Sequence, residues 1–568
     1  MFFKDARPED TIRIIRRILV KSGFTVDEIS WRHPVPNVWS VFVRERGCRL
    51  LFANGKGASR LLALASALGE FMERLNTGYC FSHYSLHGLK VNKGFLFFPN
   101  ETWFPASKSG IPDGILTSEL RRLYDPDKCL ASTHLIDRSS AGIKKGICAI
   151  PFTRTADEKK VFFPISILDN LYASNGMAAG NTPAEARVQA LSEVLERYVK
   201  FQVIAKGLAL PEIPKRYYAA YPKITTAIDA LKQKGFGVYL YDASLGGRYP
   251  VITIALIDRD KEKCFLAFGA HPLFEVALTR TLTELLQGQD LRRFKGFQKP
   301  CARLADAADW TNLEEHFIDS SGLVPKRFFK KKKDFSFCYV NHGGLRKDEL
   351  AYLTAIIHKA GKDIYMADFV ESGFYTCRIV VPGMSEIYPA GNLVSYNANR
   401  GVKLCGSVMR LPKLKKSELE TLLDNLEAGY AGDIERVCHV LGIPFETGSP
   451  WLGVCFGELK MLVFFALNKI EEARRQLMWC LYTGCVRKDA RLLYECVSVI
   501  LDKSDCSDKK RLFKPAVIQN ARRICRGENV FNDLFDSHGM PFGIRAHREL
   551  LKAFAKARKM RKYKQAGT

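Results

Sequence analysis

The sequence lacks the segments that would place a protein across a membrane or carry it out of the cell. No run among its 568 residues approaches the roughly 18 consecutive apolar residues of a membrane span. The first twenty residues contain acidic side chains and lack the ordered regions of a secretory signal. We therefore expect a mature cytoplasmic protein with no membrane partner.

Cysteine motifs that bind metals are also missing. The sixteen cysteines are scattered and form no Cys-x-x-Cys pair; the closest two, Cys480 and Cys485, have four residues between them. Many lie in apolar segments, as buried thiols do in reducing compartments. This pattern argues against a zinc or iron–sulfur site in the chain.

The common catalytic signatures are scarce. The sequence contains neither His-Glu-x-x-His nor Gly-x-Ser-x-Gly. The segment 54–59, Asn-Gly-Lys-Gly-Ala-Ser, is not a Walker loop, because no glycine stands five residues before Gly55 and a glycine follows Lys56. It could still cradle a phosphate at a helix N-terminus. His271, within Gly-Ala-His-Pro, is expected to be a structural turn residue rather than a base.

Acidic residues are the minority charge. The chain has 86 Lys and Arg against 60 Asp and Glu, a net charge of +26. Such a balance favours polyanionic partners such as the ribosome or its RNA, although a basic composition shared by a whole lineage would produce it too. The densest run, residues 326–333, is expected to be a solvated loop, with an RNA contact as the alternative.

Length and hydrophobic pattern predict two parts. Residues 1–400 alternate strand-like runs with helical patterns, whereas residues 410–568, which open with a basic linker at 411–416, hold helical patterns with few strands. Residues 467–473 resemble the second helix of a helix–turn–helix repeat. We expect an α+β domain over 1–400, followed by an all-helical tetratricopeptide-like domain over 410–568, in which Leu419, Leu422, Leu423 and Leu426 share one helix face.

Within the first part, a pair of strands followed by a glutamate-bearing helix recurs three times. The expected strand pairs are 38–43 with 50–52, 147–150 with 161–167, and 251–257 with 264–268. The helix after the first pair is expected to run from about 58 to 77. Such repeated units predict α+β layers in which the three helices pack side by side.

The glutamates of these helices recur at helical spacing. Glu70 and Glu73 are three residues apart, as are Glu193 and Glu196, so each pair lies on one helix face. At 100° per residue, Glu185 and Glu196 fall about 20° apart on the second helix. The third helix carries Glu284. The residues beside the acidic face of the second helix are apolar, so this face adjoins one that faces a core.

Each glutamate also has a structural explanation. Pairs such as Glu193 with Arg197, four residues apart, add only about 0.2–0.5 kcal/mol on a helix surface. The segment 182–185, Thr-Pro-Ala-Glu, is typical of a capping box with proline at the first helical position. However, carboxylates collected near a core repel one another unless a cation joins them, and Mg²⁺ takes oxygen ligands that it often shares with phosphates. The recurrence therefore favours metal and nucleotide binding.

Four motifs together resemble the YcaO-domain family. They are Asn-Gly-x-x-Ala-Gly-Asn-Thr-x-x-Glu-Ala at 175–186, Leu-Ser-Glu-Val-x-Glu-Arg at 191–197, Phe-Gly-Ala-His-Pro at 268–272 and Glu-Leu-Leu-Gln-Gly at 284–288. The resemblance begins at Lys4 and continues into the helical tail, so it covers essentially the whole chain.

The resemblance implies a YcaO-type ATP-binding domain with ATP and Mg²⁺ as cofactors. The implied magnesium ligands are Glu70, Glu73, Glu185, Glu193, Glu196 and Glu284. Lys56, Arg197 and Arg280 would meet the phosphate charge. The residues implied around the rest of the nucleotide are Lys4, Thr11, Ser66 and Asn181.

The resemblance also implies alternatives for what ATP does. It is closest to members that assist the β-methylthiolation of an aspartate in the twelfth small-subunit ribosomal protein. Because the chain has no Cys-x-x-x-Cys-x-x-Cys motif, it would assist a separate radical iron–sulfur methylthiotransferase. Other members phosphorylate a peptide amide to drive cyclodehydration or thioamide formation, but they often end in a proline-rich tail that this chain lacks. A ribosome-associated scaffold is a third hypothesis, and the resemblance is compatible with a homodimer.

Overall fold

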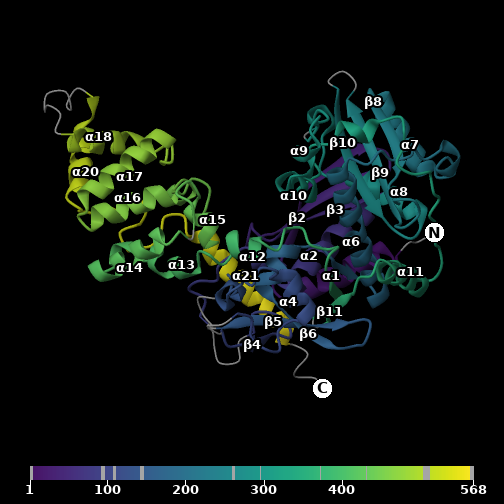
Figure 1. Ribbon diagram of the computed structural model, residues 1–568, viewed down its shortest axis with the longest axis horizontal. Helices are drawn as coiled ribbons and strands as arrows, with labels where there is room; N and C mark the ends of the chain where they lie inside the picture. The colour runs from purple at the N-terminus through teal and green to yellow at the C-terminus, as the bar shows by residue number, and fades with distance from the viewer. Residues whose placement is uncertain are drawn as a thin grey trace.

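The computed structural model has a large lobe of mixed helices and strands and a smaller helical lobe (Figure 1). It describes residues 4–90, 96–106, 110–140, 146–258, 262–294, 296–370, 372–429, 431–502 and 512–562. The strands of the larger lobe form three sheets. The predicted fold class, an α+β domain followed by a helical part, is confirmed.

The first sheet is an antiparallel meander in the order β1-β2-β3, with bounds β1 Val26–Val35, β2 Val38–Glu45 and β3 Phe52–Gly57. It confirms the predicted strand at 38–43, whereas the partner strand predicted at 50–52 is displaced, because β3 begins at Phe52 and runs to Gly57. Helices α1 (Pro8–Lys21) and α2 (Arg60–Thr77) pack together, and α2 also covers β2 and β3. Ser59 caps α2, because its side chain accepts a hydrogen bond from the backbone N–H of Leu62.

The second sheet has the order β10-β9-β8 and is also antiparallel. Its bounds are β8 Phe236–Asp242, β9 Val251–Asp258 and β10 Lys263–Ala270. The predicted pair 251–257 with 264–268 is confirmed by the register that sets Phe265 opposite Leu256. Helix α8 (Phe274–Leu285) packs on this sheet beside α7 (Pro222–Gln233), and their buried aliphatic side chains form one core with its inner face.

The third sheet corrects the prediction for the second unit. Its order is β4-β5-β11-β12-β7, with β6 paired to β5; the bounds are β4 Thr102–Phe104, β5 Ile147–Arg154, β6 Lys160–Pro164, β7 Met177–Gly180, β11 Tyr365–Phe369 and β12 Tyr375–Val380. The strand expected over 161–167 ends at Pro164, and Ile165–Ile167 are helical. The strand that leads into helix α6 (Pro183–Lys206) is therefore β7, which none of the predicted strands covers.

A glycine near the end of each leading strand brings the following helix close. A Cβ on Gly55 of β3 would lie 2.1 Å from the carbonyl oxygen of Ala63 in α2. A Cβ on Gly180 of β7 would lie 2.8 Å from the nitrogen of Ala186 in α6, and one on Gly269 of β10 would lie 2.3 Å from Oγ1 of Thr281 in α8. Each contact is closer than side-chain carbons tolerate. The Gly-Lys-Gly segment is thus part of a strand that packs on a helix rather than a loop, and its contact with a phosphate stays a prediction.

The helical lobe has its own apolar core. Its helices are α13 Val402–Val408, α14 Lys416–Glu427, α15 Val437–Leu441, α16 Phe456–Ala466, α17 Ile470–Thr483, α18 Arg491–Leu501 and α20 Pro515–Cys525. All four leucines predicted to share a face of α14 are buried. Residues 467–469 form the turn between α16 and α17, so the predicted second helix starts at Ile470. The tetratricopeptide-like character stays a prediction.

The last helix, α21 (Arg545–Lys562), leaves the helical lobe and returns to the larger one (Figure 1). Phe554 is buried against Phe81 in an edge-to-face contact with ring centroids 4.9 Å apart. Lys556 forms an ion pair of 3.1 Å with the buried Glu45 of β2. The chain therefore crosses twice between the lobes, and the domain limits 1–400 and 410–568 stay a prediction.

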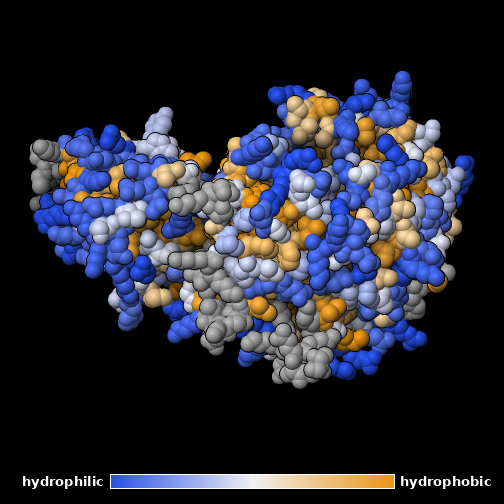
Figure 2. Space-filling view, turned by 60° about the horizontal axis from the view of Figure 1, so that its bottom comes forward, coloured by the Kyte–Doolittle hydropathy of each residue, from blue (hydrophilic) through white to orange (hydrophobic). Residues whose placement is uncertain are grey.

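The remaining helices surround the sheets. They are α3 Tyr79–Ser82, α4 Ser118–Tyr124, α9 Leu304–Ala308, α10 Trp310–Ile318, α11 Arg346–Lys359 and α12 Asn392–Ser395. The basic run 326–333 is largely exposed around the buried Phe328, as expected for a solvated loop. On the face shown in Figure 2, hydrophobic residues are scattered among hydrophilic ones. Within the described ranges, no helix combines the length and apolar character needed to cross a membrane.

Candidate functional site

Charged side chains from β3, α2, α6 and α8 meet around Lys56. We call this set the glutamate site; its members are Lys56, Glu70, Glu73, Glu193, Glu196, Arg197, Arg280 and Glu284. Lys56 on β3 forms an ion pair with Glu284 on α8. Burial lowers the pKa of Lys56 to about 8, although the negative charge of Glu196 on α6 opposes that shift. Strand and helices distant in sequence thus converge on one ammonium group.

The two glutamates of α2 face α6. Burial raises the pKa of Glu70, while its ion pair with Arg74, at 2.6 Å, acts in the opposite direction. The pKa of Glu73 is raised well above its ordinary value, first by burial and then by the negative charges of Glu193 and Glu70. Mutual repulsion of this kind makes a site favour protons or another cation.

The face of α6 continues the site with alternating charges. Glu193 pairs with Arg197 at 3.1 Å, and both side chains are about four-fifths buried. One turn further, Lys200 is buried and donates hydrogen bonds to the carbonyl oxygen of His316 at 2.9 Å and to Ser320 at 3.3 Å. Burial, together with the charge of Arg197, lowers the pKa of Lys200 to about 8. Lys200 thereby ties α6 to the end of α10.

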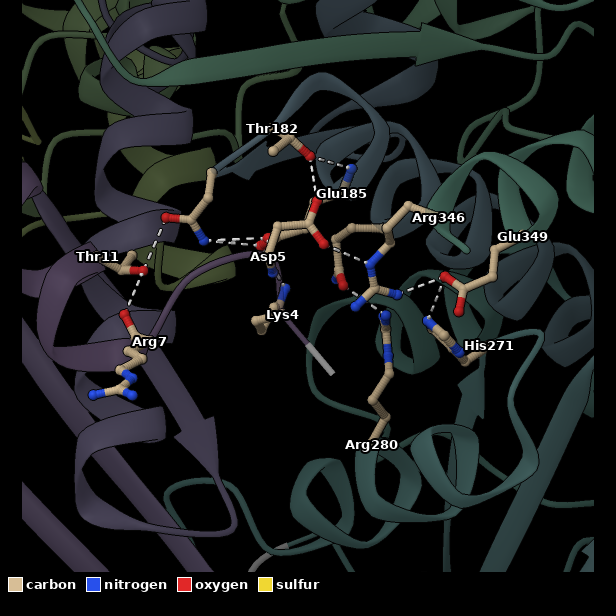
Figure 3. A network of polar contacts seen from close by, with 12 residues as sticks. Lys4, Asp5, Arg7, Thr11, Thr182, Glu185, His271, Arg280, Arg346 and Glu349 are labelled. Carbon is tan, nitrogen blue, oxygen red and sulfur yellow. Dashed lines mark hydrogen bonds and ion pairs between the residues drawn. The ribbon is translucent and has the colours of Figure 1, made fainter. Parts of the chain in front are cut away.

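A second cluster surrounds Glu185 at the start of α6 (Figure 3). The Glu185 carboxylate is buried, accepts a hydrogen bond from the backbone N–H of Asp5 at 2.9 Å and pairs with Lys4 at 3.2 Å. Asn181 also donates to this carboxylate, and Thr11 donates to Asn181 at 2.9 Å. The structure therefore brings together Lys4, Thr11, Asn181 and Glu185, which the resemblance had placed around one ligand.

The capping box predicted at this helix start is only half correct. The hydroxyl of Thr182 accepts a hydrogen bond from the backbone N–H of Glu185 at 3.2 Å, and Pro183 occupies the first helical position. The carboxylate of Glu185 does not return to the backbone of Thr182; it binds the segment at Lys4 and Asp5. A charged partner and an amide from elsewhere in the chain displace the local contact.

Arg280 on α8 lies between the two clusters. Its guanidinium donates to the side-chain oxygen of Gln189 at 2.6 Å. Gln189 lies one turn after Glu185 and one turn before Glu193, on the same face of α6. The sequence analysis missed Gln189 and Lys200, although their four-residue spacing from the glutamates could have revealed both.

Ser66 and His271 are two further residues that the sequence singled out. Ser66 is exposed on α2, one turn before Glu70, so it lies on the glutamate-bearing face. His271 is buried in the turn before α8, where its Nδ1 accepts a hydrogen bond from the backbone N–H of Leu273 at 3.0 Å. Burial and the charge of Arg280 hold the pKa of His271 far below its ordinary value, so it stays neutral. Its expected role in the turn is confirmed.

The carboxylates are not already arranged as a cage for a metal. Among the residues that the structure describes, no three acidic, histidine or cysteine side chains are grouped closely enough to hold a metal ion. Three of them pair with neighbouring cations instead: Glu70 with Arg74, Glu193 with Arg197 and Glu284 with Lys56. Partly exposed pairs of this kind are worth no more than about 1 kcal/mol. Their carboxylates can change partners when a divalent cation binds.

The residues present nevertheless suit Mg²⁺ with a phosphate-bearing ligand. The repulsion that raises the pKa of Glu73 is relieved by a divalent cation, which takes carboxylate oxygens as ligands. Lys56, Arg197 and Arg280 lie beside these carboxylates and match the charge of phosphate groups. A site of this composition can accommodate a divalent cation together with phosphate groups.

Comparison with known proteins gives the family. A family model described as "YcaO cyclodehydratase, ATP-ad Mg2+-binding" matches residues 54–385, and one described as "YcaO cyclodehydratase C-terminal domain" matches residues 401–563. The chain therefore belongs to the YcaO family. The predicted family and the predicted cofactors, ATP and Mg²⁺, are confirmed, whereas the roles of individual site residues stay predictions.

Curated relatives match over nearly the full length. The chain is 41% identical over 567 residues to "Ribosomal protein S12 methylthiotransferase accessory factor YcaO" of Escherichia coli, covering 97% of each chain. It is also 41% identical to an uncharacterized protein of Haemophilus influenzae, covering 98% of each chain.

Similar solved structures are more distant. One is a heterocyclase in complex with substrate and cofactor, at 16% identity and a TM-score of 0.45, with 68% of this chain and 55% of that chain covered. Another is YcaO from Methanopyrus kandleri bound with AMPPCP and Mg²⁺, at 19% identity and a TM-score of 0.43, with 67% of this chain and 92% of that chain covered.

Proposed function

We propose that this chain binds and hydrolyses Mg-ATP and promotes β-methylthiolation of an aspartate in the twelfth small-subunit ribosomal protein. The observation that carries the proposal is the 41% identity, over 97% of both chains, to the Escherichia coli accessory factor. The sequence has no cysteine triad for an iron–sulfur cluster. Its partner is therefore a separate radical iron–sulfur methylthiotransferase.

The glutamate site is the proposed location of the nucleotide. The carboxylates of α2, α6 and α8 would hold Mg²⁺, and Glu185 would join them after releasing Lys4. Lys56, Arg197 and Arg280 would meet the phosphates, with Lys4, Thr11, Ser66 and Asn181 around the rest of the nucleotide. When bound, Mg²⁺ would neutralise the negative charge that develops on a transferred phosphoryl group. Support comes from the raised pKa of Glu73 and from the cations beside it.

Lys200 and Gln189 would position these groups rather than touch the nucleotide. Lys200 fixes α6 against the end of α10 through His316 and Ser320. Gln189 holds the guanidinium of Arg280 in place between the two clusters. Both contacts would restrict the movement of the charged side chains that face the phosphates. An active site is preorganised in this way before its ligand binds.

Mass spectrometry of ribosomal proteins from a strain that lacks this gene tests the proposal. We expect the methylthiolated fraction of the ribosomal protein to fall and to return when the wild-type gene is restored. Restoration with a Glu193→Gln variant should fail. Undiminished methylthiolation in the deletion strain would contradict the proposed role without affecting nucleotide binding, which is measured on the purified protein.

A second candidate is ATP-dependent modification of a peptide backbone, which the description of the family model as a cyclodehydratase favours. In that case ATP turnover would require an added peptide, and the peptide would lose a water molecule or exchange an amide oxygen for sulfur. ATP turnover by the purified protein with and without candidate peptides separates this function from the accessory role.

The remaining partners are proposals of the same kind. An accessory factor for a ribosomal protein would act in the cytoplasm, and the net charge of +26 would favour contact with the ribosome or its RNA. A homodimer is the proposed assembly. If the chain were only a scaffold, Glu193→Ala would leave its function intact, whereas reversing the charge of residues 330–333 would abolish ribosome binding.

A further inference from the structure

A cavity of about 230 Å³ lies where the two lobes meet, and it shares no residue with the glutamate site. One wall is formed by Ser85, His87 and Arg138 of the larger lobe. Most of the rest of the lining comes from α13 and the residues just after it, including Lys403, Ser407 and Arg410. The cavity is thus built from segments that are far apart in sequence.

All the charged side chains in the lining of this cavity are positive. Arg138, Lys403 and Arg410 are cationic, and no aspartate or glutamate belongs to the lining. The two serine hydroxyls and the ring of His87 add neutral hydrogen-bonding groups. Burial and the charge of Arg410 lower the pKa of His87, so its imidazole is neutral and offers one N–H at physiological pH.

Arg138 is fixed in the wall by hydrogen bonds to backbone carbonyl groups. Its Nε donates to the carbonyl oxygen of Ala398 at 2.6 Å, and its Nη1 donates to that of His83 at 2.8 Å. Within the described ranges, no carboxylate lies at ion-pairing distance from it. Burial and the neighbouring Arg400 lower the pKa of Arg138 to about 10, although the charge of Asp169 opposes that shift, and the guanidinium remains charged at neutral pH. A partly desolvated cation that is hydrogen-bonded to neutral groups is stabilised by an anion.

The junction holds this geometry through a close backbone contact. Gly442, just after α15, has a φ of +67°, and a Cβ there would lie 2.5 Å from Cδ of Arg138. The carbonyl oxygen of Gly442 accepts a hydrogen bond from the backbone N–H of Ser85 at 2.9 Å. These contacts join the lobes at the cavity and keep Arg138 in its wall.

Arg410 lines the cavity from the helical lobe and has a weak carboxylate partner. Its Nε donates to the carbonyl oxygen of Gly406 at 3.1 Å, and its nearest carboxylate, Glu418, is 4.0 Å away. The side chain of Arg410 is 58% exposed, so this pair is screened by water and contributes little. Arg410 is therefore available to a ligand that enters the cavity.

We propose that this cavity is an anion site that binds a phosphate group, either as inorganic phosphate or as the phosphate of a small ester. Two arginines and a lysine in the lining of one cavity match a dianion, because guanidinium groups bind phosphate oxygens in pairs. Drug-sized ligands occupy pockets of about 300–1,000 Å³, so a cavity of this size suits a smaller molecule.

Isothermal titration of the full-length protein with inorganic phosphate at low salt tests the proposal. Lys403→Gln and Arg410→Gln each remove one lining charge at an exposed position, so both variants should fold. Each should weaken phosphate binding about tenfold or more, because each variant loses a charge-assisted hydrogen bond to the phosphate. Arg548→Gln, at an exposed position of α21 that does not line the cavity, is the matched control and should bind as the wild type does.

Two further titrations identify the preferred ligand and the site at which it binds. Glycerol 3-phosphate titrated in the same way distinguishes a phosphate ester from free phosphate, and tighter binding of either one supports the site. The variant Arg280→Gln alters the glutamate site instead. Loss of phosphate binding in Arg280→Gln but not in Arg410→Gln would overturn the proposal, as would the absence of binding at millimolar phosphate. Thermal unfolding of each variant shows whether the fold is retained.

Discussion

Replacing Glu193 with glutamine removes one negative charge from the glutamate site and keeps the size of the side chain. Glu193 pairs with Arg197 on the same helix and faces Glu73 of α2, whose pKa its charge helps to raise. The substitution therefore removes one attraction and one repulsion at once. Its effect on folding and its effect on metal–nucleotide binding can be estimated separately.

The effect on folding should be small. A helical pair at four-residue spacing, such as the 3.1 Å contact of Glu193 with Arg197, contributes about 0.3–0.5 kcal/mol. Relief of the repulsion at Glu73 offsets that loss, so the free energy of unfolding without ligand should change by less than about 0.5 kcal/mol. The effect on binding should be large, because a lost contact to a charged ligand is worth roughly 1.5–3 kcal/mol, or about ten- to a hundredfold in affinity.

Titration of the purified protein with a non-hydrolysable ATP analogue, with and without Mg²⁺, measures the binding term, and denaturant unfolding measures the folding term. Glu495→Gln is the matched control, because Glu495 forms the same kind of helical pair with Arg491 at 2.9 Å in the other lobe. Undiminished Mg²⁺-dependent binding by Glu193→Gln would refute the assignment. A loss of more than about 2 kcal/mol in the stability of the unliganded protein would show that the residue serves the fold instead.

Four further predictions concern proton release, the pH dependence of stability, strand packing and the last helix. Because the pKa values of Glu70 and Glu73 are raised in the fold, Mg²⁺ should displace protons from these carboxyl groups, and more of them at pH 6 than at pH 8. Titration calorimetry in buffers of different ionisation enthalpy measures the proton release. An identical heat of binding in all buffers would argue against it. By the same shift, stability without metal should fall as pH rises above about 4.5, since the folded state holds those protons more tightly than the unfolded chain. Gly55→Ala should lower the free energy of unfolding by about 1–3 kcal/mol or more, because the added Cβ overpacks β3 against α2. Gly69→Ala, within α2 itself and with open space around the added Cβ, should raise the free energy of unfolding by about 0.5–1 kcal/mol. Equal effects of the two variants in chemical denaturation would contradict this account. Phe554→Ala should lower the stability by about 3–5 kcal/mol, because its ring is buried in the core of the larger lobe, and a change below about 1 kcal/mol would show that α21 is not anchored there.

Hydrophobic and turn patterns predicted much of the secondary structure. The strand pairs around 38–57 and 251–270 and the helix that bears Glu70 were found from alternation and helical spacing, which depend on neighbouring residues alone. The pattern failed at residues 165–180, where apolar β-branched residues became a short helix and small residues became β7. Short runs of this kind have weak local preferences, and β7 exists because β12 pairs with it.

Partners across the site were beyond the reach of local patterns. The sequence offered Thr182 as the partner of Glu185, but the fold supplies Lys4 and the backbone of Asp5, which arrive from the other end of the domain. Likewise, a charged side chain at the surface of an isolated helix gives no sign that burial will lower the pKa of Lys200 to about 8.

By itself, the sequence determined which glutamates share a helix face, the family to which the chain belongs and the cofactors of that family. These follow from spacing along one helix and from motifs that are written in the chain. The folded chain was needed to see that α2, α6 and α8 direct their glutamates toward Lys56, that Gly55 packs closely against α2, and that α21 returns to the larger lobe. The physical reason is that helix spacing is a local property, whereas the face that a helix buries, and the charges that it meets there, are set by the packing of segments hundreds of residues apart.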